Sequence, residues 1–267
     1  MPSSPRLFTA TVVRSTRISP SFVRVTIAGE QLDEFDWVGH DHWFRLFLPP
    51  RPDVALQLPE VSGRGWYKPY LAIPEAVRPH CSNYTVADLR QSAQGVEMDI
   101  DVVLHWDAAG AIAGAVAIWA NSAAPGSPVA LLDQGRLFDL PDDAREVHLV
   151  ADETGLPAVR GILRDLDPTL EGSAIVEVPD PGDIEELAGP PGVEVTFVSR
   201  SGAAPGAAAL AELRQRAAPS ADAYAFVVGE STLATEGRRA LHRAGLPKSR
   251  ITFSGFWKHT PHRAHTR

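Results

Sequence analysis

The sequence has 267 residues and a formal net charge of -8, and its acidic surface repels nucleic acid and anionic membranes, so we expect neither as a partner. Cys81 is the only cysteine, which excludes an intrachain disulfide and fits a reducing, cytoplasmic setting. The first residues do not resemble a signal peptide, and no apolar run approaches the roughly 20 residues that span a bilayer. A metal site would rest on His259, His262 and His265, whose spacing suits a flexible tail, so we expect no metal.

The first half of the chain predicts a small antiparallel β-barrel. Its clearest strand is residues 96–104, where apolar side chains alternate with three acidic ones. Several short strands separated by Pro and Gly turns are typical of such a barrel. The predicted strands are residues 9–13, 22–28, 42–48, 96–104 and 127–132, and a helix is predicted over residues 111–123.

A Pro-rich segment, residues 49–79, is too long for an ordinary hairpin loop. It contains Trp66, Tyr67 and Tyr70, so we expect it to be ordered and packed. It is either a surface excursion held by its aromatic side chains or a lid over a pocket, and we favour the first interpretation.

The second half of the chain alternates strands and helices, which predicts a parallel sheet covered on both faces. A boundary near Pro141 would give two domains, residues 1–140 and 141–267, and we expect the tail after Lys258 to be frayed. The predicted strands are residues 147–150, 174–178, 193–198, 224–228 and 251–253, and the predicted helices are residues 156–166, 207–217 and 233–244.

The first strand-to-helix connection of this second half is HLVADETGLPAVRGIL, residues 148–163. Ligands of a parallel sheet lie beyond the carboxyl ends of its strands, and a helix N-terminus attracts a phosphate or an amide. Thr154 could cap this helix, so a well-capped helix without a ligand is an equally good interpretation. The chain contains no G-x-G-x-x-G fingerprint.

Two later strand ends carry further candidate residues. Gly229 permits close approach of the backbone, and Glu230 could bind a ligand or cap the next helix. Phe256 and Trp257 follow the last predicted strand and could stack on a planar ring or pack in a core.

The motifs ADETGLPA, VVGES with GRRAL, and SGFWKH resemble those of the siderophore-interacting protein family in order and spacing. The resemblance continues in the first half with DHWFRLFLP, WYKPYLAIP, NYTV, DIDVVLH and LLDQG, and so spans nearly the whole chain. It implies a ferredoxin-reductase-like fold, with a flavin-binding barrel followed by an NAD(P)H-binding α/β domain. It also implies FAD- and NAD(P)H-dependent reduction of a ferric siderophore, which is a small-molecule substrate.

The resemblance also implies roles for individual residues. Those implied to bind or border the cofactors are Tyr84, Thr85, His105, Gly114, Trp119, Asp152, Glu153, Thr154, Gly229, Glu230, Phe256 and Trp257. Trp106 and Lys258 fall on the substrate side, where Lys258 would attract an anionic ferric siderophore or simply be solvated. If acid–base groups are needed, the candidates are His105, Tyr84, Asp101 and Glu153.

The sequence departs from the family at the flavin phosphates. The family motif R-x-Y-T-x-R reads SNYTVA here, so Ser82 and Ala87 replace its two arginines. Ala117 stands where the family has a phosphate-binding serine, and Trp106 replaces a glycine. Each lost charge-assisted hydrogen bond weakens binding by about 1.5–3 kcal/mol, so two lost arginines put FAD binding in question.

Two hypotheses follow from this departure. The first is a reductase with altered phosphate contacts, in which Arg78, Arg90 or Arg136 substitutes for the missing arginines. The second is a family member that has lost FAD and uses the vacated cleft as a cofactor-independent cyclase or pericyclic catalyst, or as a small-molecule binder in secondary-metabolite biosynthesis.

Overall fold

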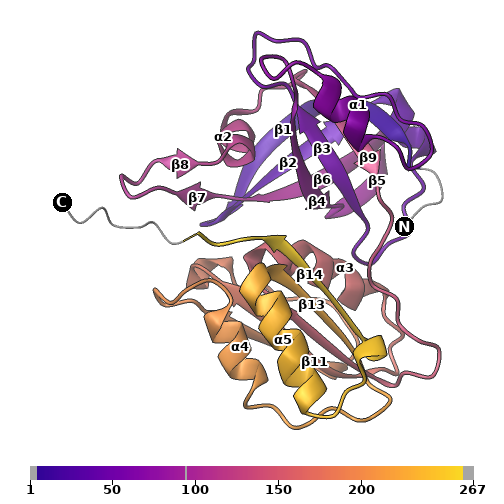
Figure 1. Cartoon of the computed structure of the whole chain (residues 1–267), viewed down its shortest axis with the longest axis vertical. Coiled ribbons are helices and arrows are strands. Elements are labelled where there is room, and N and C mark those ends of the chain that lie inside the picture. Colours follow the sequence, from indigo (N-terminus) through magenta and orange to yellow (C-terminus); the bar gives the residue numbers. More distant parts are fainter. Residues whose placement is uncertain (1–4, 94, 261–267) are drawn as a thin grey trace. The chain divides into compact units, whose positions relative to one another are not determined.

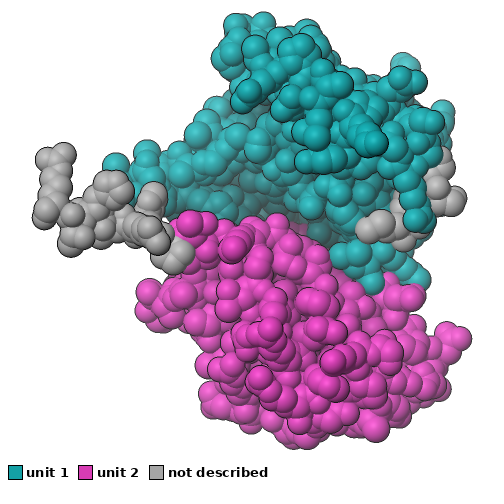
Figure 2. Space-filling model, viewed as in Figure 1, with its two compact units in different colours: residues 1–137, 160–162 teal, residues 138–159, 163–267 magenta. Residues whose placement is uncertain are grey.

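The structure is a computed structural model that describes residues 5–93 and 95–260. The chain divides into two compact units, which Figure 2 distinguishes by colour. Unit 1 comprises residues 1–137 and 160–162, and unit 2 comprises residues 138–159 and 163–267. The frayed tail expected after Lys258 lies largely outside the described residues, as do His262 and His265.

Unit 1 contains a seven-stranded sheet in the order β4-β3-β9-β1-β2-β6-β5, in which every registered pair is antiparallel (Figure 1). The predicted antiparallel first domain is therefore confirmed. The strands are β1 (Leu7–Ser19), β2 (Phe22–Ala28), β3 (Trp43–Leu48), β4 (His80–Thr85), β5 (Asp88–Ser92), β6 (Gly95–Val103) and β9 (Pro128–Asp133), and a 3-10 helix η1 spans Glu30–Glu34. Alternate side chains of β2 and β6, such as Ile27 and Met98, fill the barrel core.

A separate two-stranded ribbon of β7 (His105–Trp106) and β8 (Ile112–Ala113) precedes helix α2 (Ala115–Ser122). The helix predicted from residue 111 is therefore wrong in its first residues. Ile112 pairs with Trp106 in the ribbon, and Gly114 has a φ of +91°, a conformation that glycine adopts at little cost and that precludes helix at this residue. The buried face of α2 packs into the barrel core.

The Pro-rich segment contains α1 (Tyr67–Ala72) and packs on the face of β3 that points away from the barrel core. The ring centroids of Trp66 and Tyr70 each lie 6.0 Å from that of Phe47. Phe44, which is an odd number of positions from Phe47 in β3, points into the barrel core instead. The expected packing of the aromatic side chains is confirmed.

Unit 2 contains a five-stranded sheet in the order β12-β11-β10-β13-β14, and all its pairs are parallel, as predicted. Helices α4 and α5 cover one face and α3 lies on the other (Figure 1). The elements are β10 (Glu146–Ala151), α3 (Leu156–Asp165), β11 (Glu171–Val178), β12 (Gly192–Ser199), α4 (Ala207–Leu213), β13 (Tyr224–Glu230), α5 (Ser231–Arg243) and β14 (Ile251–Trp257), with 3-10 turns η2 (Glu153–Gly155), η3 (Pro181–Asp183) and η4 (Lys248–Arg250). Within the described residues, no helix is long and apolar enough to cross a membrane.

Candidate functional site

The carboxyl edge of the unit 2 sheet brings together three residues from three neighbouring strand ends. Asp152 directly follows β10, Glu230 ends β13 and Trp257 ends β14. One carboxylate oxygen of Asp152, Oδ2, accepts hydrogen bonds from the backbone N–H of Glu230 at 2.6 Å and from the indole Nε1 of Trp257 at 2.9 Å. The buried carboxylate thus ties the three strand ends together.

The other oxygen of Asp152 organises the turn into α3. Oδ1 accepts from the backbone N–H of Thr154 at 2.9 Å and from its hydroxyl at 2.6 Å. Asp152 therefore caps the 3-10 turn η2, and the hydroxyl of Thr154, the candidate cap of the following helix, donates to this carboxylate. Burial raises the pKa of Asp152, and the hydrogen bonds from Thr154, Trp257 and Glu230 oppose this rise.

The carboxylate of Asp152 also leaves no room for a side chain at Gly229. Its φ is +120°, and a Cβ atom at this position would lie 2.5 Å from Cγ of Asp152. The group that approaches the Gly229 backbone closely is thus the carboxylate of Asp152. A side chain here would displace Asp152 and the contacts that it makes.

Glu230 acts as a helix cap, one of the two alternatives that its sequence position left open. Its carboxylate accepts hydrogen bonds from the backbone N–H groups of Thr232 and Leu233 in the first turn of α5, and from that of His259 at 3.2 Å. Burial alone would raise the pKa of Glu230, but the N–H donors of His259 and Thr232 outweigh it and lower the pKa.

Arg200, which the sequence reading missed, connects two buried acidic residues of unit 2. Its guanidinium pairs with Glu153 through Nη2 and with Glu177 through Nε, the latter at 2.8 Å. Burial, and then the neighbouring charge of Asp152, raise the pKa of Glu153 to about 7, although Arg200 opposes the rise. Glu153 is only 1% exposed. This candidate acid–base group is therefore enclosed and ion-paired.

The remaining candidates of unit 2 lie beside these contacts. Phe256 is half-buried and Lys258 is exposed. Within residues 5–93 and 95–260, no group of three or more His, Cys, Asp or Glu side chains could hold a metal ion.

Strand β4 carries the residues implied to contact the flavin ring. His80, Ser82 and Tyr84 alternate along this strand and share one face, on which Tyr84 packs against the barrel core. Burial raises the pKa of Tyr84 above its ordinary value of 10.0, so its phenol stays neutral at physiological pH. Thr85, on the opposite face, is buried beside Trp43 in the antiparallel register.

The two positions that lack the family's arginines are filled by groups without charge. The Ser82 hydroxyl lies 2.7 Å from Nε2 of His80, and burial lowers the pKa of that imidazole, which keeps it neutral. Ala87 is buried, and its backbone N–H donates to the carbonyl of Asp99 at 2.9 Å. Neither position offers a cation to a phosphate.

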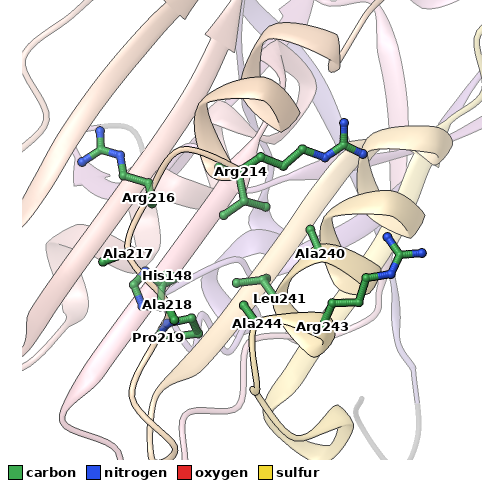
Figure 3. A pocket seen from close by; sticks show the side chains of 11 residues that line it. His148, Arg214, Arg216, Ala217, Ala218, Pro219, Ala240, Leu241, Arg243 and Ala244 are labelled. Carbon is green, nitrogen blue, oxygen red and sulfur yellow. The ribbon is translucent and has the colours of Figure 1, made fainter.

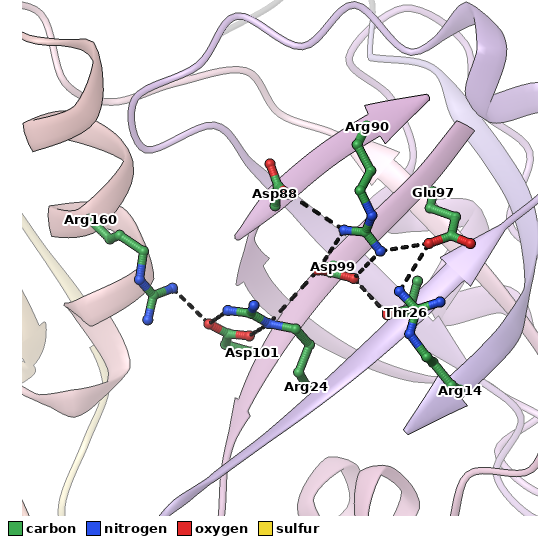
Figure 4. Close-up of polar contacts among 9 residues, drawn as sticks. All are labelled: Arg14, Arg24, Thr26, Asp88, Arg90, Glu97, Asp99, Asp101 and Arg160. Atoms are coloured by element: carbon green, nitrogen blue, oxygen red, sulfur yellow. Dashed lines mark hydrogen bonds and ion pairs between the residues drawn. The ribbon is translucent and has the colours of Figure 1, made fainter. Parts of the chain in front are cut away.

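Arg90, one of the possible substitutes, is held in an ion-pair network on β2, β5 and β6 (Figure 4). Its Nη1 lies 2.7 Å from Asp99 and its Nη2 lies 2.6 Å from Glu97. The hydrogen bond to Asp99, followed by that to Glu97, raises the pKa of Arg90 despite its desolvation. In the same network Arg24 forms a two-pronged pair with Asp101 at 2.7 and 2.9 Å, which occupies this acid–base candidate.

The other possible substitutes are also accounted for. Arg78 donates to the carbonyls of Ile73 at 3.0 Å and Leu71 at 2.8 Å, inside the Pro-rich segment. Arg136 is exposed, and its Nη1 lies 3.5 Å from Nδ1 of His40.

Arg45 is the arginine that lies nearest to β4 along the sheet, because it is paired with Asn83 in the register of β3 and β4. Its guanidinium lies 4.6 Å from the ring centroid of Trp66 and 5.5 Å from that of Trp43, and it donates to the Asn83 amide oxygen at 3.0 Å. Asn83 and Ser82 point to opposite faces of β4. Arg45 therefore lies on the wrong face to replace an arginine at position 82.

The ribbon and the start of α2 complete the candidate residues of unit 1. His105 and Trp106 are exposed, and the guanidinium of Arg17 lies 5.7 Å from the Trp106 ring centroid. Gly114 precedes α2 without a side-chain cap, and a Cβ atom there would meet no atom within 4 Å. The first-turn N–H groups of α2 therefore receive no hydrogen bond from a capping side chain of Gly114. Trp119 packs against the barrel core.

A pocket of about 310 Å³ in unit 2 lies apart from all these candidates (Figure 3). It is lined by the C-terminal ends of α4 and α5 and by His148 near the start of β10, and so lies towards the amino edge of the sheet. The two ring nitrogens of His148 contact the Ser173 hydroxyl at 2.9 Å and Glu146 at 2.7 Å, and Arg216 pairs with Glu194 at 2.8 Å. The pocket contains none of the predicted site residues.

Comparisons with known proteins cover both units. Residues 11–137 match the family model described as the siderophore-interacting FAD-binding domain, and residues 144–260 match the one described as siderophore-interacting protein. The chain is 29% identical to the NADPH-dependent ferric-chelate reductase of Escherichia coli over 92% of this chain and 91% of that protein. It is 28% identical to the ferric vibriobactin reductase ViuB of Vibrio cholerae over 92% and 87% of the two chains.

Solved structures agree with the predicted ferredoxin-reductase-like fold. A siderophore utilization protein from T. fusca superposes with a TM-score of 0.77 and 28% identity, over 95% of this chain and 93% of that one. A ferredoxin-NADP+ reductase from Plasmodium falciparum superposes with a TM-score of 0.64 and 12% identity, over 93% and 96% of the two chains, and so shares the fold.

Proposed function

Because this chain belongs to the siderophore-interacting protein family, we propose that it is an oxidoreductase that uses NAD(P)H and a flavin to reduce the ferric iron of a siderophore. The observation that carries the proposal is that both parts of such a reductase are present in the expected order. An antiparallel flavin-type sheet is followed by a parallel sheet whose carboxyl edge is built around Asp152. The relatives named as ferric-chelate reductases support the same activity.

We assign the nicotinamide side to the carboxyl edge of the unit 2 sheet, where ligands of such sheets bind. Asp152 there is a positioning residue, because both its oxygens already accept hydrogen bonds from Thr154, Glu230 and Trp257. It fixes the direction of the Trp257 indole, and the neighbouring Phe256 is half-buried. The half-buried Thr154 and the N-terminus of α3 would meet the polar part of the nucleotide.

We assign the flavin ring to Tyr84 and Thr85 of β4, with His105 of the ribbon and Gly114 at the start of α2 further along the cofactor. The half-buried phenol of Tyr84 packs on the core and is neutral, which suits stacking on a planar heteroaromatic ring. The flavin, when bound, supplies the change from two-electron to one-electron transfer that iron requires.

The substrate side carries one exposed cation among the candidates, Lys258, which would attract an anionic ferric complex. Of the acid–base candidates, Glu153 is enclosed and paired with Arg200, and Asp101 is paired with Arg24. Reduction of ferric iron by a hydride donor needs no protein acid or base at the iron. The contribution of this chain is accordingly to bind and orient its ligands.

The cofactor-independent cyclase and the small-molecule binder are not favoured, since the relatives are named as reductases. The substitutions in the altered motif remove contacts to the flavin phosphates. The hydrogen bonds of Asp152 at the carboxyl edge of the unit 2 sheet are all present.

The test measures ferrous iron released from a ferric siderophore or ferric citrate, captured by a ferrous-specific chelator, in the presence of excess FAD. One hydride from NAD(P)H supplies two electrons, so each NAD(P)H oxidised should yield two ferrous ions and one proton. Parallel reactions with NADH and NADPH identify the donor, and reactions without protein measure the background of free flavin. If NAD(P)H oxidation is no faster than this background when FAD, FMN or riboflavin is supplied in separate reactions, the proposal is overturned.

A further inference from the structure

We propose that flavin is an exchangeable ligand of this chain, bound through its ring with little preference for FAD over FMN or riboflavin. This inference rests on the proposed function and deepens it, because it specifies how the flavin is held. It follows from a contrast between the two parts of the candidate flavin site. The surface for the ring is present on β4, whereas the motif positions for the phosphates, Ser82 and Ala87, carry no cation.

The ring surface depends on apolar packing and therefore does not distinguish the three flavins. Tyr84 is packed on the barrel core beside the buried Phe44, its partner in the register of β3 and β4. Thr85 follows it at the end of the strand, is 8% exposed and has its side chain on the opposite face, so Tyr84 supplies the side chain of this surface. FAD, FMN and riboflavin carry the same isoalloxazine ring, so Tyr84 would contribute equally to the binding of each.

The phosphate side lacks charge at both motif positions. The hydroxyl of Ser82 is engaged with His80, whose pKa is lowered by burial, so this pair presents a neutral surface. Ala87 is 4% exposed and presents a methyl group to the protein interior. Riboflavin lacks phosphates, FMN has one and FAD has a pyrophosphate. Cations at these two positions would therefore give the three flavins different affinities, and their absence removes this difference.

No arginine of the described residues on or beside β4 takes over this function. Arg90 is held by Asp99 and Glu97, and moving away would break its charge-assisted hydrogen bonds to both carboxylates, which are also paired with Arg24 and Arg14. Arg45 is stacked between two indole rings on the opposite face of β4.

Arg136, the exposed one of the candidate substitutes, lies at the other end of the strand. It follows Gly135, whose carbonyl accepts from the N–H of Trp43, and Trp43 is paired with Thr85. At about 3.3 Å per residue, Ser82 lies about 10 Å along β4 from this end. Arg136 therefore does not replace an arginine at position 82.

The first turn of α2 remains as a neutral anion site, because the N–H groups that follow Gly114 have no partner within the helix. Its dipole favours a phosphate but lacks the full charge of a guanidinium. A protein with a net charge of -8 also repels a pyrophosphate at low ionic strength. We therefore expect FAD to exceed riboflavin in affinity by about tenfold at most.

The experiment measures dissociation constants for FAD, FMN and riboflavin with the whole chain, through quenching of flavin fluorescence at fixed ionic strength. We expect three values within about tenfold of one another, and purified protein that loses its flavin on gel filtration. An FAD dissociation constant at least 100-fold below that of riboflavin, or FAD retained in a one-to-one ratio, would overturn the inference.

Ser82→Arg restores one cation on the phosphate face, and Asn83→Arg is its matched control on the opposite face of the same strand. We expect Ser82→Arg to tighten FAD about tenfold or more and to leave riboflavin unchanged, since one charge-assisted hydrogen bond contributes on this scale. Asn83→Arg, at an exposed position, should leave the ratio of the two constants unchanged. An equal gain for riboflavin and FAD in Ser82→Arg would count against the inference.

The two proposals fail in different ways. Tight, stoichiometric binding of FAD together with NAD(P)H oxidation above background would overturn the proposal of an exchangeable flavin and support the proposed reductase function. Unquenched fluorescence with all three flavins, together with background rates of NAD(P)H oxidation, would overturn both. Should Ser82→Arg not fold, the ratio of the wild-type constants for FAD and riboflavin alone decides.

Discussion

The indole Nε1 of Trp257 donates a hydrogen bond of 2.9 Å to the buried carboxylate of Asp152, across 105 positions of sequence. The same oxygen accepts the backbone N–H of Glu230. The carboxyl ends of β10, β13 and β14 therefore share one acceptor. A ligand that binds at this edge meets an indole whose orientation is set by a residue with no free oxygen of its own.

Replacing Asp152 by Asn tests this arrangement. In either orientation of the amide, its NH2 group faces at least one backbone N–H, that of Glu230 or that of Thr154, and one or two buried donors lose their acceptor. We expect Asp152→Asn to lower the free energy of unfolding of unit 2 by about 3 kcal/mol. Chemical denaturation followed by the fluorescence of Trp257, the only tryptophan of unit 2, measures this change.

Thr154→Val is the control for this prediction. It removes the hydroxyl donor and keeps the backbone N–H, so we expect a loss of only about 1 kcal/mol. Equal losses in the two variants would contradict the view that Asp152 joins the strand ends, because Thr154 contacts only the turn.

The sequence predicted those parts of the fold that local patterns encode. The sequence predicts strand β6 because apolar and acidic side chains alternate with period two along it. Strand β4, with the sequence HCSNYT, lacks this alternation, so the sequence predicts no strand there. It becomes a strand through its pairing with β3, a contact that no local pattern reports. The first residues of the helix predicted over 111–123 were wrong because Ile112 pairs with Trp106 instead.

The residues of the candidate site can be predicted from local motifs, whereas the contacts between them cannot. Asp152, Gly229 and Trp257 were selected from motifs at strand ends, but their mutual contacts depend on the order of the strands in the sheet. Arg200 was missed because it lies 47 positions from Glu153 and belongs to no motif. A sequence signal for it does exist, since it lies two residues beyond the strand predicted over residues 193–198 and directly follows β12, whose carboxyl end lies at the same edge of the sheet.

The raised pKa of Glu153 predicts a pH dependence of stability. In the unfolded chain its carboxyl titrates near 4.5, and in the folded protein at about 7. Below pH 4.5 it is protonated in both states. As the pH rises from 4.5 to 7, the unfolded chain releases the proton first, so the free energy of unfolding falls, by an amount on the order of 3 kcal/mol.

Glu153→Gln isolates this contribution because glutamine does not titrate. The difference between wild type and variant in the free energy of unfolding should fall between pH 4.5 and 7 and level off above pH 7. The raised pKa of Asp152 affects both proteins and largely cancels in the difference. A difference that is constant with pH, or that rises with it, would show that the pKa of Glu153 is not raised.

Arg200→Met removes the cation shared by Glu153 and Glu177. Both carboxylates are buried, so we expect a loss of about 3–5 kcal/mol at pH 8, where Glu153 is ionised in the wild type. Arg239→Met breaks the exposed pair with Glu236 and should change stability by less than about 1 kcal/mol. At pH 5.5 the Arg200→Met loss should shrink, because a protonated Glu153 needs no counter-charge. An undiminished loss at that pH would contradict the pairing.

Gly229 and Gly245 provide a matched pair for the last prediction. Both have positive φ, +120° and +111°, so substitution by alanine strains the backbone of each by about 1–2 kcal/mol. A Cβ atom at Gly245 meets nothing within 4 Å, whereas one at Gly229 would lie 2.5 Å from the Asp152 carboxylate carbon. Gly245→Ala should therefore cost the backbone strain alone.

Gly229→Ala must in addition displace Asp152, which is bonded to Glu230 and Trp257. We expect its loss of unfolding free energy to exceed that of Gly245→Ala by about 2 kcal/mol or more, and the Trp257 emission to change in the folded state. Because the strain is common to both variants, the difference reports the close approach of Gly229 to Asp152. Equal losses with unchanged emission would mean that the carboxylate tolerates a methyl group, and the tie between the strand ends would then be looser than the hydrogen-bond distances indicate.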